Sequence, residues 1–168
     1  MTPQMMTLDP ILDAPLSVQI HLVFALPALL VGPFALFRQR RDRLHKALGY
    51  VFVLTLFGLA VSGLFIRSGA PVVLHFGPIH LLSLFTLHGL AGGLWAIRKG
   101  DIAAHRETMR SLWFGAMGLA GLFTLVPGRT MHAVLIEPLG WPAWPLIGAG
   151  VVALAVIWRR WQPLPRRA

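Results

Sequence analysis

Histidines are the side chains of this 168-residue sequence whose types and spacing could do chemistry. The chain has seven histidines and no cysteine, so thiol chemistry is excluded and imidazole is the main soft metal ligand. Four histidines follow a pattern: His45 comes 24 positions after His21, and His105 comes 25 positions after His80. His45 and His105 each precede a basic residue. The pattern indicates a degenerate internal repeat of one helical hairpin, with a histidine near each end.

Two imidazoles at one depth on facing helices are what a low-spin haem b needs as axial ligands. The repeat predicts an outer pair, His21 with His80, and an inner pair, His45 with His105. The haem propionates would need cations. The candidates are Arg43, Lys46, Arg106 and Arg110 near the inner pair, and Arg67 or Arg129 near the outer pair. The sequence therefore predicts a haem b protein that transfers electrons, with quinone as a candidate donor or acceptor.

Other interpretations of these histidines stay open. Hydrogen bonds between helices would also satisfy His21 and His80. An interfacial position would let His45 and His105 cap helices or contact lipid phosphates. His88 has no counterpart in the repeat and is expected near the middle of its helix. It is a candidate replacement inner ligand or proton relay, although a hydrogen-bonded core histidine is the favoured interpretation.

A zinc or copper site is the competing metal hypothesis. The outer set of His21, His75, His80 and His132 has enough imidazoles for it. The sequence lacks the HxxxH and HExxH patterns, however, and no carboxylate accompanies the membrane histidines. Hydrolytic metal chemistry usually adds a base such as glutamate, so this hypothesis ranks lower. We expect His75 and His132 to lie in solvated outer loops.

The composition indicates a membrane protein. Hydrophobic residues make up 56% of the chain, charged residues only 12%, and the mean hydropathy is +0.69. Soluble domains have about 25% charged residues. The net charge of +9 could suggest a nucleic-acid partner, but the cations lie between apolar runs, where membrane topology needs them. We therefore expect membrane lipid as a partner and no nucleic acid.

The histidines must be positioned by apolar segments long enough to cross a bilayer, which takes about 20 residues each. Five such segments are predicted as helices: Leu16–Phe37, His45–Ile66, Val72–Ile97, Ala104–Val126 and Ala143–Trp161. The predicted fold is an all-α integral membrane protein. Its parts are a polar leader (1–15), a duplicated four-helix core (16–126), an outer loop (127–142), a fifth helix (143–161) and a basic tail (162–168).

The distribution of cations predicts the orientation. If the N-terminus is outside, 13 of the 15 lysines and arginines fall on the inner side. The positive-inside rule therefore predicts an outer N-terminus and a cytoplasmic C-terminus. Trp141 and Trp144 would then lie at the outer interface, and Trp95, Trp158 and Trp161 at the inner one. The oligomeric state is not predicted.

Two stretches carry a family resemblance, GPFALFRQRRDRLHKALGYVFVL (Gly32–Leu54) and WAIRKGDIAAHRETMRSL (Trp95–Leu112). The first contains an R-x-H-[RK]-x-x-G-[YW] element and the second an RxGD…HRxxMRS element. The sequence resembles a bacterial family of predicted integral membrane proteins whose function is unknown. This resemblance implies the inner membrane of a bacterium as the location. The matching residues are Arg43, His45, Lys46, Gly49, Tyr50, Arg98, Gly100, Asp101, His105, Arg106, Met109, Arg110 and Ser111.

The expected arrangement is also similar to the two-haem transmembrane b-type cytochromes, which use alternate helices of a four-helix core for each haem. That resemblance implies axial ligands at both histidine pairs. The inner pair lies nearer the surface here than that pattern usually places it. The rival class is a non-catalytic membrane protein, such as an assembly factor or a small transporter. In that class the His-Lys and His-Arg elements would bind lipid headgroups or a partner.

Overall fold

The computed structural model describes residues 7–38, 40–67, 76–140 and 142–160. Four of its helices are long and apolar enough to cross a membrane: α2 (Leu16–Phe37), α3 (Arg43–Gly63), α4 (Pro78–Arg98) and α8 (Ala143–Arg160). The bounds of α2 are those predicted, and α3 begins two residues earlier and ends three residues earlier than predicted. The predicted start of α4, residues 72–75, and the predicted end of α8, Trp161, lie outside the described residues.

The segment predicted as a helix over Ala104–Val126 is a continuous helical run with a change of type inside it. It consists of α5 (Ile102–Leu112), the π-helix η1 (Trp113–Leu119) and α6 (Ala120–Phe123). Three short elements complete the described part: α1 (Asp9–Leu12), α7 (Thr130–Leu135) and the 3-10 helix η2 (Glu137–Leu139). π-helical turns inside α-helices are frequent at functional sites.

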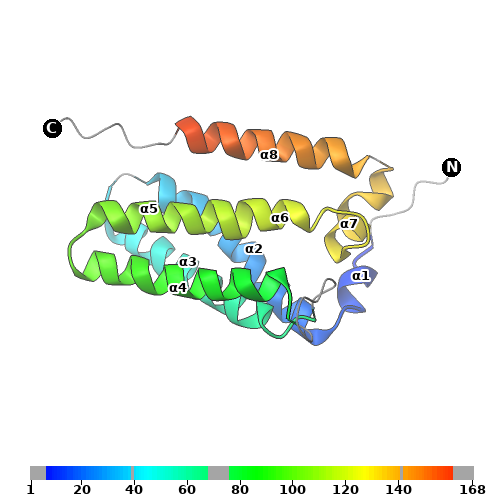
Figure 1. Ribbon diagram of the computed structural model, residues 1–168, viewed down its shortest axis with the longest axis horizontal. Helices are drawn as coiled ribbons and strands as arrows, with labels where there is room; N and C mark the ends of the chain where they lie inside the picture. The colour runs from blue at the N-terminus through cyan, green and yellow to red at the C-terminus, as the bar shows by residue number, and fades with distance from the viewer. Residues whose placement is uncertain (1–6, 39, 68–75, 141, 161–168) are drawn as a thin grey trace.

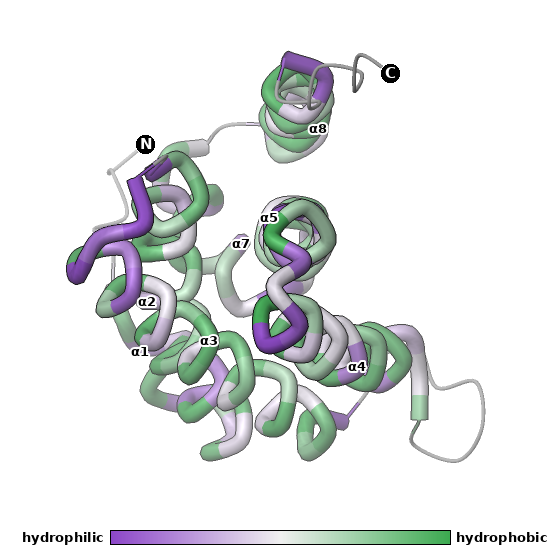
Figure 2. Tube along the Cα trace, turned by 90° about the vertical axis from the view of Figure 1, so that its left-hand side faces the viewer, coloured by the Kyte–Doolittle hydropathy of each residue, from purple (hydrophilic) through white to green (hydrophobic). Residues whose placement is uncertain are grey.

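The long helices form a ring around a common core. Helix α2 packs along α3, α3 along α4, and α4 along α5, and η1 closes the ring against α2 (Figures 1 and 2). Helix α8 lies outside the ring and packs on η1 and α6. Two hairpins, α2–α3 and α4–α5, turn at the same end of the molecule (Figure 1). We call this the basic end, because its turns contain Arg40, Arg41, Arg98 and Lys99, and we call the opposite end the distal end.

Both turns at the basic end are built around a capping aspartate. Asp42 accepts a hydrogen bond from the backbone N of His45 at 2.9 Å and begins α3. Asp101 accepts one from Ala104 N at 2.9 Å and begins α5. Such side chains satisfy N–H groups that the first helical turn leaves without partners. Arg38 donates from both Nε and Nη2 to the Asp42 carboxylate, and these bonds lower the pKa of that carboxyl well below its usual range.

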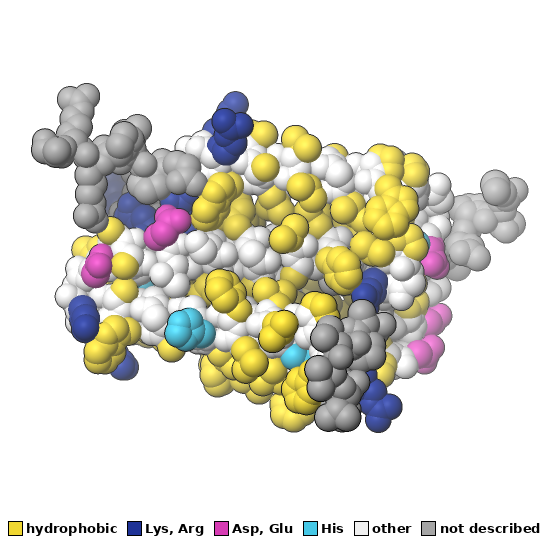
Figure 3. Space-filling model, in the orientation of Figure 1, with side chains coloured by type: hydrophobic (Ala, Val, Ile, Leu, Met, Phe, Trp, Pro, Cys, Tyr) yellow, Lys and Arg dark blue, Asp and Glu magenta, His cyan; other side chains and the backbone are white. Residues whose placement is uncertain are grey.

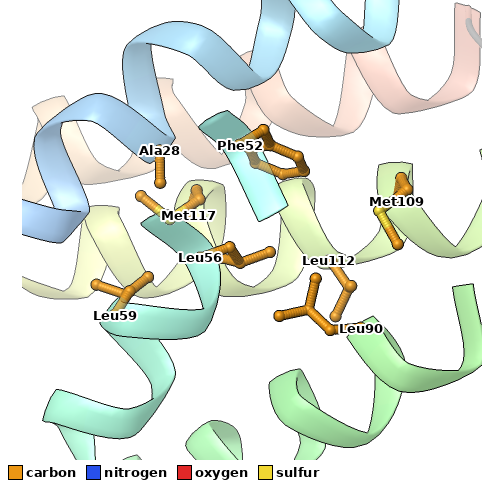
Figure 4. Packing of buried hydrophobic residues seen from close by; sticks show 8 residues of the cluster. All are labelled: Ala28, Phe52, Leu56, Leu59, Leu90, Met109, Leu112 and Met117. Carbon is orange, nitrogen blue, oxygen red and sulfur yellow. The ribbon is translucent and has the colours of Figure 1, made fainter. Parts of the chain in front are cut away.

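The core of the ring is filled at mid-height by apolar side chains from every helix of the ring (Figure 4). They are Ala28, Phe52, Leu56, Leu59, Leu90, Met109, Leu112 and Met117. Glycines allow the helices to approach: a Cβ on Gly32 of α2 would lie 2.5 Å from Trp113 Nε1 and 3.0 Å from Phe52 Cε2. A Cβ on Gly118 would lie 3.0 Å from Leu154 of α8. Small residues thus lie at the helix contacts, as is usual in membrane proteins.

The outer surface of the helices is also apolar. Large hydrophobic side chains such as Leu30, Phe34, Leu54 and Phe85 are exposed. Figure 3 shows apolar side chains spread over the middle of the visible face, with most charged side chains toward its two ends. A protein in water rarely exposes apolar surface on this scale. The surface and the four long helices are those of a membrane protein.

Candidate histidine sites at the two ends of the core

His21 joins α2 to α3 near the distal end. Its Nδ1 lies 3.1 Å from Ser62 Oγ, and the Ser62 hydroxyl lies 3.0 Å from the Leu59 carbonyl oxygen. A carbonyl can only accept, so the single serine proton goes to Leu59 and His21 is the donor to Ser62. The neutral ring then keeps an unprotonated Nε2. A hydrogen bond between helices, one of the open interpretations of His21, is therefore confirmed.

His80 closes the first turn of α4. Its side chain is only 3% exposed, and its Nδ1 accepts a hydrogen bond from Gly77 N at 3.1 Å. In the neutral ring the proton must therefore be on Nε2. The ring of Phe76 packs against it, with 4.8 Å between ring centroids. The structure thus gives His80 a capping role within its own helix. No hydrogen bond from His80 to another helix is present within the described ranges.

Gly63 brings three helices together beside these histidines. A Cβ on Gly63 of α3 would lie 2.5 Å from Ser83 Oγ of α4 and 3.5 Å from His21 Cε1 of α2. Ser62 and Ser83 are both buried, and Ser83 follows His80 by one helical turn. The distal end therefore holds a buried polar cluster. No hydrogen bond or ring contact in the described part of the chain joins His21 directly to His80.

The two histidines of the basic end are held differently. His105 Nδ1 lies 2.9 Å from the carbonyl oxygen of Gly93, so it donates to α4 and leaves Nε2 unprotonated in the neutral ring. The Nδ1 of His45 is buried and has no hydrogen-bond partner among the described residues. Buried polar atoms are usually paired, so an unpaired one needs an explanation. Across the described ranges, no hydrogen bond or ring contact links His45 to His105.

The predicted cationic residues fall into two groups. Arg43 and Arg106 are exposed at the basic end. Arg110 is only 5% exposed: its Nη1 lies 3.6 Å from Glu107 Oε2, and its guanidinium lies 5.3 Å from the ring centroid of Trp158. Arg110 therefore links α5 to α8 through a cation–π contact. Arg129 precedes α7, and its guanidinium lies 4.9 Å from the Phe123 ring.

The family is decided by a match over nearly the whole chain. Residues 18–158 match the family described as "Predicted membrane protein (DUF2306)". The chain belongs to DUF2306. No curated protein and no solved structure matches it. The match includes both motif elements of the predicted resemblance and extends through most of α8, which lies beyond the residues on which that resemblance was based.

The DUF2306 fold places His88 differently from the prediction. The side chain is exposed, so its interpretation as a hydrogen-bonded core histidine is wrong. The buried side of α4 consists of His80, Ser83, Thr86, Leu90 and Gly93. These follow one another at helical spacing, and His88 lies off that stripe. A ligand inside the four-helix ring cannot be reached from this surface without rotation of the helix.

His132 is also placed differently from the prediction of a solvated loop. It is buried in α7, with 9% exposure, and its Nδ1 lies 3.2 Å from Glu137 Oε1. Helix α7 packs against α1 at the distal end (Figure 1). The sequence contained a signal, because a histidine and a glutamate five residues apart can pair across a short helix end. The sequence did not indicate that α1 would pack against α7 and bury this histidine.

The zinc or copper hypothesis drew on an outer set of four histidines, and one of them, His75, lies outside the described residues. Elsewhere in the chain, within the ranges that the structure describes, no three histidine or carboxylate side chains form a group that could hold a metal ion. His21 bonds to Ser62, His80 to the backbone of Gly77, and His132 to Glu137. These three imidazoles therefore each have a different hydrogen-bond partner.

Proposed function

We propose that this DUF2306 member is a membrane electron-transfer protein that binds haem b in its four-helix ring. The observation that carries the proposal is the way His21 and His105 are held. Each ring donates its Nδ1–H to a neighbouring helix, which leaves Nε2 unprotonated in the neutral ring. Histidines that ligate metals almost always donate their other N–H in this manner, which fixes the tautomer and orients the ring.

The basic end fits such a cofactor better than the distal end. His105 is held through Nδ1, and His45 has a buried ring nitrogen without a partner in the described part of the chain, so ligation here breaks none of the hydrogen bonds described for this end. At the distal end, His80 would have to move its Nε2 proton and release Gly77 N. Depth alone favours the outer histidine pair as the haem site, because the inner pair lies nearer the membrane surface. The hydrogen bonds of the histidines favour the inner pair instead.

The side chains of the basic end also suit the propionate groups. Arg43 and Arg106 are exposed there and can bind carboxylates. Arg110 suits this role less well, because Glu107 and Trp158 already contact its guanidinium. When bound, haem b would supply a reversible one-electron carrier, whose potential depends on the axial ligands and their surroundings. The chain's own part would be to orient the imidazoles and to exclude water with its apolar core.

The proposal includes a topology. The run from α5 to α6 would be a fifth span beside α2, α3, α4 and α8, with the two hairpins related by duplication. The basic end would face the cytoplasm of a bacterium by the positive-inside rule, with the N-terminus outside. A quinone in the same bilayer is the proposed electron donor or acceptor. Fusions of a reporter that is active on only one side of the membrane, placed after Gly100 and after Arg67, test the orientation.

The experiment that tests the function is spectroscopic. The chain is expressed with haem supplementation, purified in detergent, and examined oxidised and after reduction with dithionite. We expect a red protein with an α-band that sharpens on reduction. The His45→Ala and His105→Ala variants should lose the band. His88→Ala, a matched change at an exposed histidine, should keep it. A colourless wild-type preparation would refute the proposal and favour the non-catalytic class, and zinc found by elemental analysis would favour the other metal hypothesis.

A further inference from the structure

An apolar groove opens on the outer surface between α3 and α4. It has a volume of about 680 Å³ and is lined by Tyr50, Leu54 and Phe57 of α3 and by Leu87, Ala91 and Leu94 of α4, among others. Pockets that bind small molecules have volumes of about 300–1,000 Å³. Apart from the hydroxyl of Tyr50, the named lining side chains are apolar, so the groove suits a hydrocarbon chain.

One end of the groove has two cations. Lys46 comes four residues before Tyr50 on α3, and Arg98 comes four residues after Leu94 on α4. Residues four apart lie on the same face of a helix, so both cations continue the lining toward the basic end. Both are exposed, and neither takes part in an ion pair within the described ranges. The groove therefore combines an apolar length with a positively charged mouth.

The depth of the groove matches one leaflet. Tyr50 and Phe57 are seven residues apart, and at about 1.5 Å per residue this is roughly 10 Å along α3. The hydrocarbon core of a bilayer is about 30 Å thick, so the groove runs from near the basic end toward the middle. Its occupant should have an anionic head at the interface and an apolar tail that stays within one leaflet.

We propose that the α3–α4 groove binds an anionic glycerophospholipid, with its phosphate between Lys46 and Arg98 and one acyl chain along the groove. The positive charge at the mouth of the groove favours an anionic lipid over a quinone or a second copy of the chain. A neutral quinone head does not require two cations. A second copy of the chain would need free carboxylates at this level, but Asp42 is paired with Arg38 and Asp101 caps α5. The inference is independent of whether haem binds.

The test compares lipids on the delipidated protein in detergent by native mass spectrometry. Phosphatidylglycerol and phosphatidylcholine are titrated separately. Each basic residue near an anionic surface strengthens binding by about fivefold. We therefore expect wild type to prefer phosphatidylglycerol clearly, and the double variant Lys46→Gln/Arg98→Gln to lose binding by roughly 25-fold. The matched control Arg159→Gln/Arg160→Gln removes the same charge from α8 and should keep the preference.

A second pair of variants tests the groove itself. Ala91→Phe fills the groove without changing charge, and we expect it to remove the preferred phosphatidylglycerol. Ala153→Phe adds the same volume to an exposed position on α8 and should not. Circular dichroism establishes that each variant is folded. Equal binding of both lipids to wild type, an equal loss in the α8 control, or displacement of phosphatidylglycerol by a quinone at equal concentration would each overturn the proposal.

Discussion

Replacing Gly32 with alanine tests whether α2 really closes the ring against η1. The added methyl group would lie 2.5 Å from Trp113 Nε1 and 3.0 Å from Phe52 Cε2. Both neighbours are rigid aromatic rings on other helices, so neither can move aside as a flexible chain end would. Overpacking of this kind costs about 1–3 kcal/mol. We expect Gly32→Ala to lower the free energy of unfolding by that amount.

The assay is reversible unfolding in mixed micelles, in which the fraction of SDS is raised and helicity is followed by circular dichroism. Gly92→Ala is the matched control, because a Cβ on Gly92 meets nothing within 4 Å. That control should be neutral or stabilising, since alanine is favoured over glycine in helices by up to about 1 kcal/mol. Gly32→Ala combined with Trp113→Leu should recover part of the loss, because residues in contact are not additive.

The result that would refute the reasoning is equal stability of Gly32→Ala and Gly92→Ala. Helix α2 would then stand further from η1 than the structure has it. The ring would be open on that side, and the apolar core that separates the two histidine ends would not be enclosed. A loss in Gly32→Ala that Trp113→Leu does not change would show that some other neighbour of Gly32 is responsible.

Three further predictions concern single side chains. Asp42→Asn should destabilise the protein at neutral pH, because the pKa of Asp42 is lower in the folded than in the unfolded state. The contribution of Asp42 to stability is present above the unfolded pKa of about 3.9 and is lost as the pH falls from there through the folded pKa. The difference between wild type and Asp42→Asn should therefore be constant above about pH 5 and shrink in acid, as measured by unfolding at several pH values. Ser62→Ala removes the hydrogen bond between α2 and α3 and should cost about 0.6–1.7 kcal/mol in the micelle assay, whereas Thr55→Val, which affects bonds within one helix, should cost less. His88→Leu replaces an exposed polar group on a lipid-facing helix and should leave stability unchanged or raise it, and a clear loss would mean that His88 has a partner.

The sequence predicted the position of residues along each helix better than the side of the helix that is buried. Lengths of apolar runs and the positions of cations depend on the bilayer thickness, and they gave the bounds of α2 and the two turns at the basic end. Rotation about each helix axis was harder, because these helices are apolar on all sides and hydrophobicity does not mark the buried face. In α4 the buried stripe contains His80, Ser83, Thr86 and Gly93, which are small or polar. Small and polar residues mark helix contacts in membranes, and that rule would have separated His88 from His80.

The candidate site was predictable only in part, for a related reason. The spacing of the repeat identified His21, His45, His80 and His105 and placed them at two ends. It could not give their hydrogen-bond partners, because these come from other helices or from local backbone geometry: Ser62 for His21, Gly77 N for His80 and the Gly93 carbonyl for His105. The π-helix η1 had no sequence signal beyond its glycines.

The peripheral position of α8 has a consequence for the order in which the molecule is assembled. The ring is complete once the chain has been synthesised through Phe123, and α8 is added afterwards against η1 and α6. Until it arrives, the guanidinium of Arg110 lacks its cation–π contact with Trp158, and contacts of this kind stabilise a charge at membrane depth. The last span therefore completes the surroundings of Arg110 only after the helices of the ring have been made.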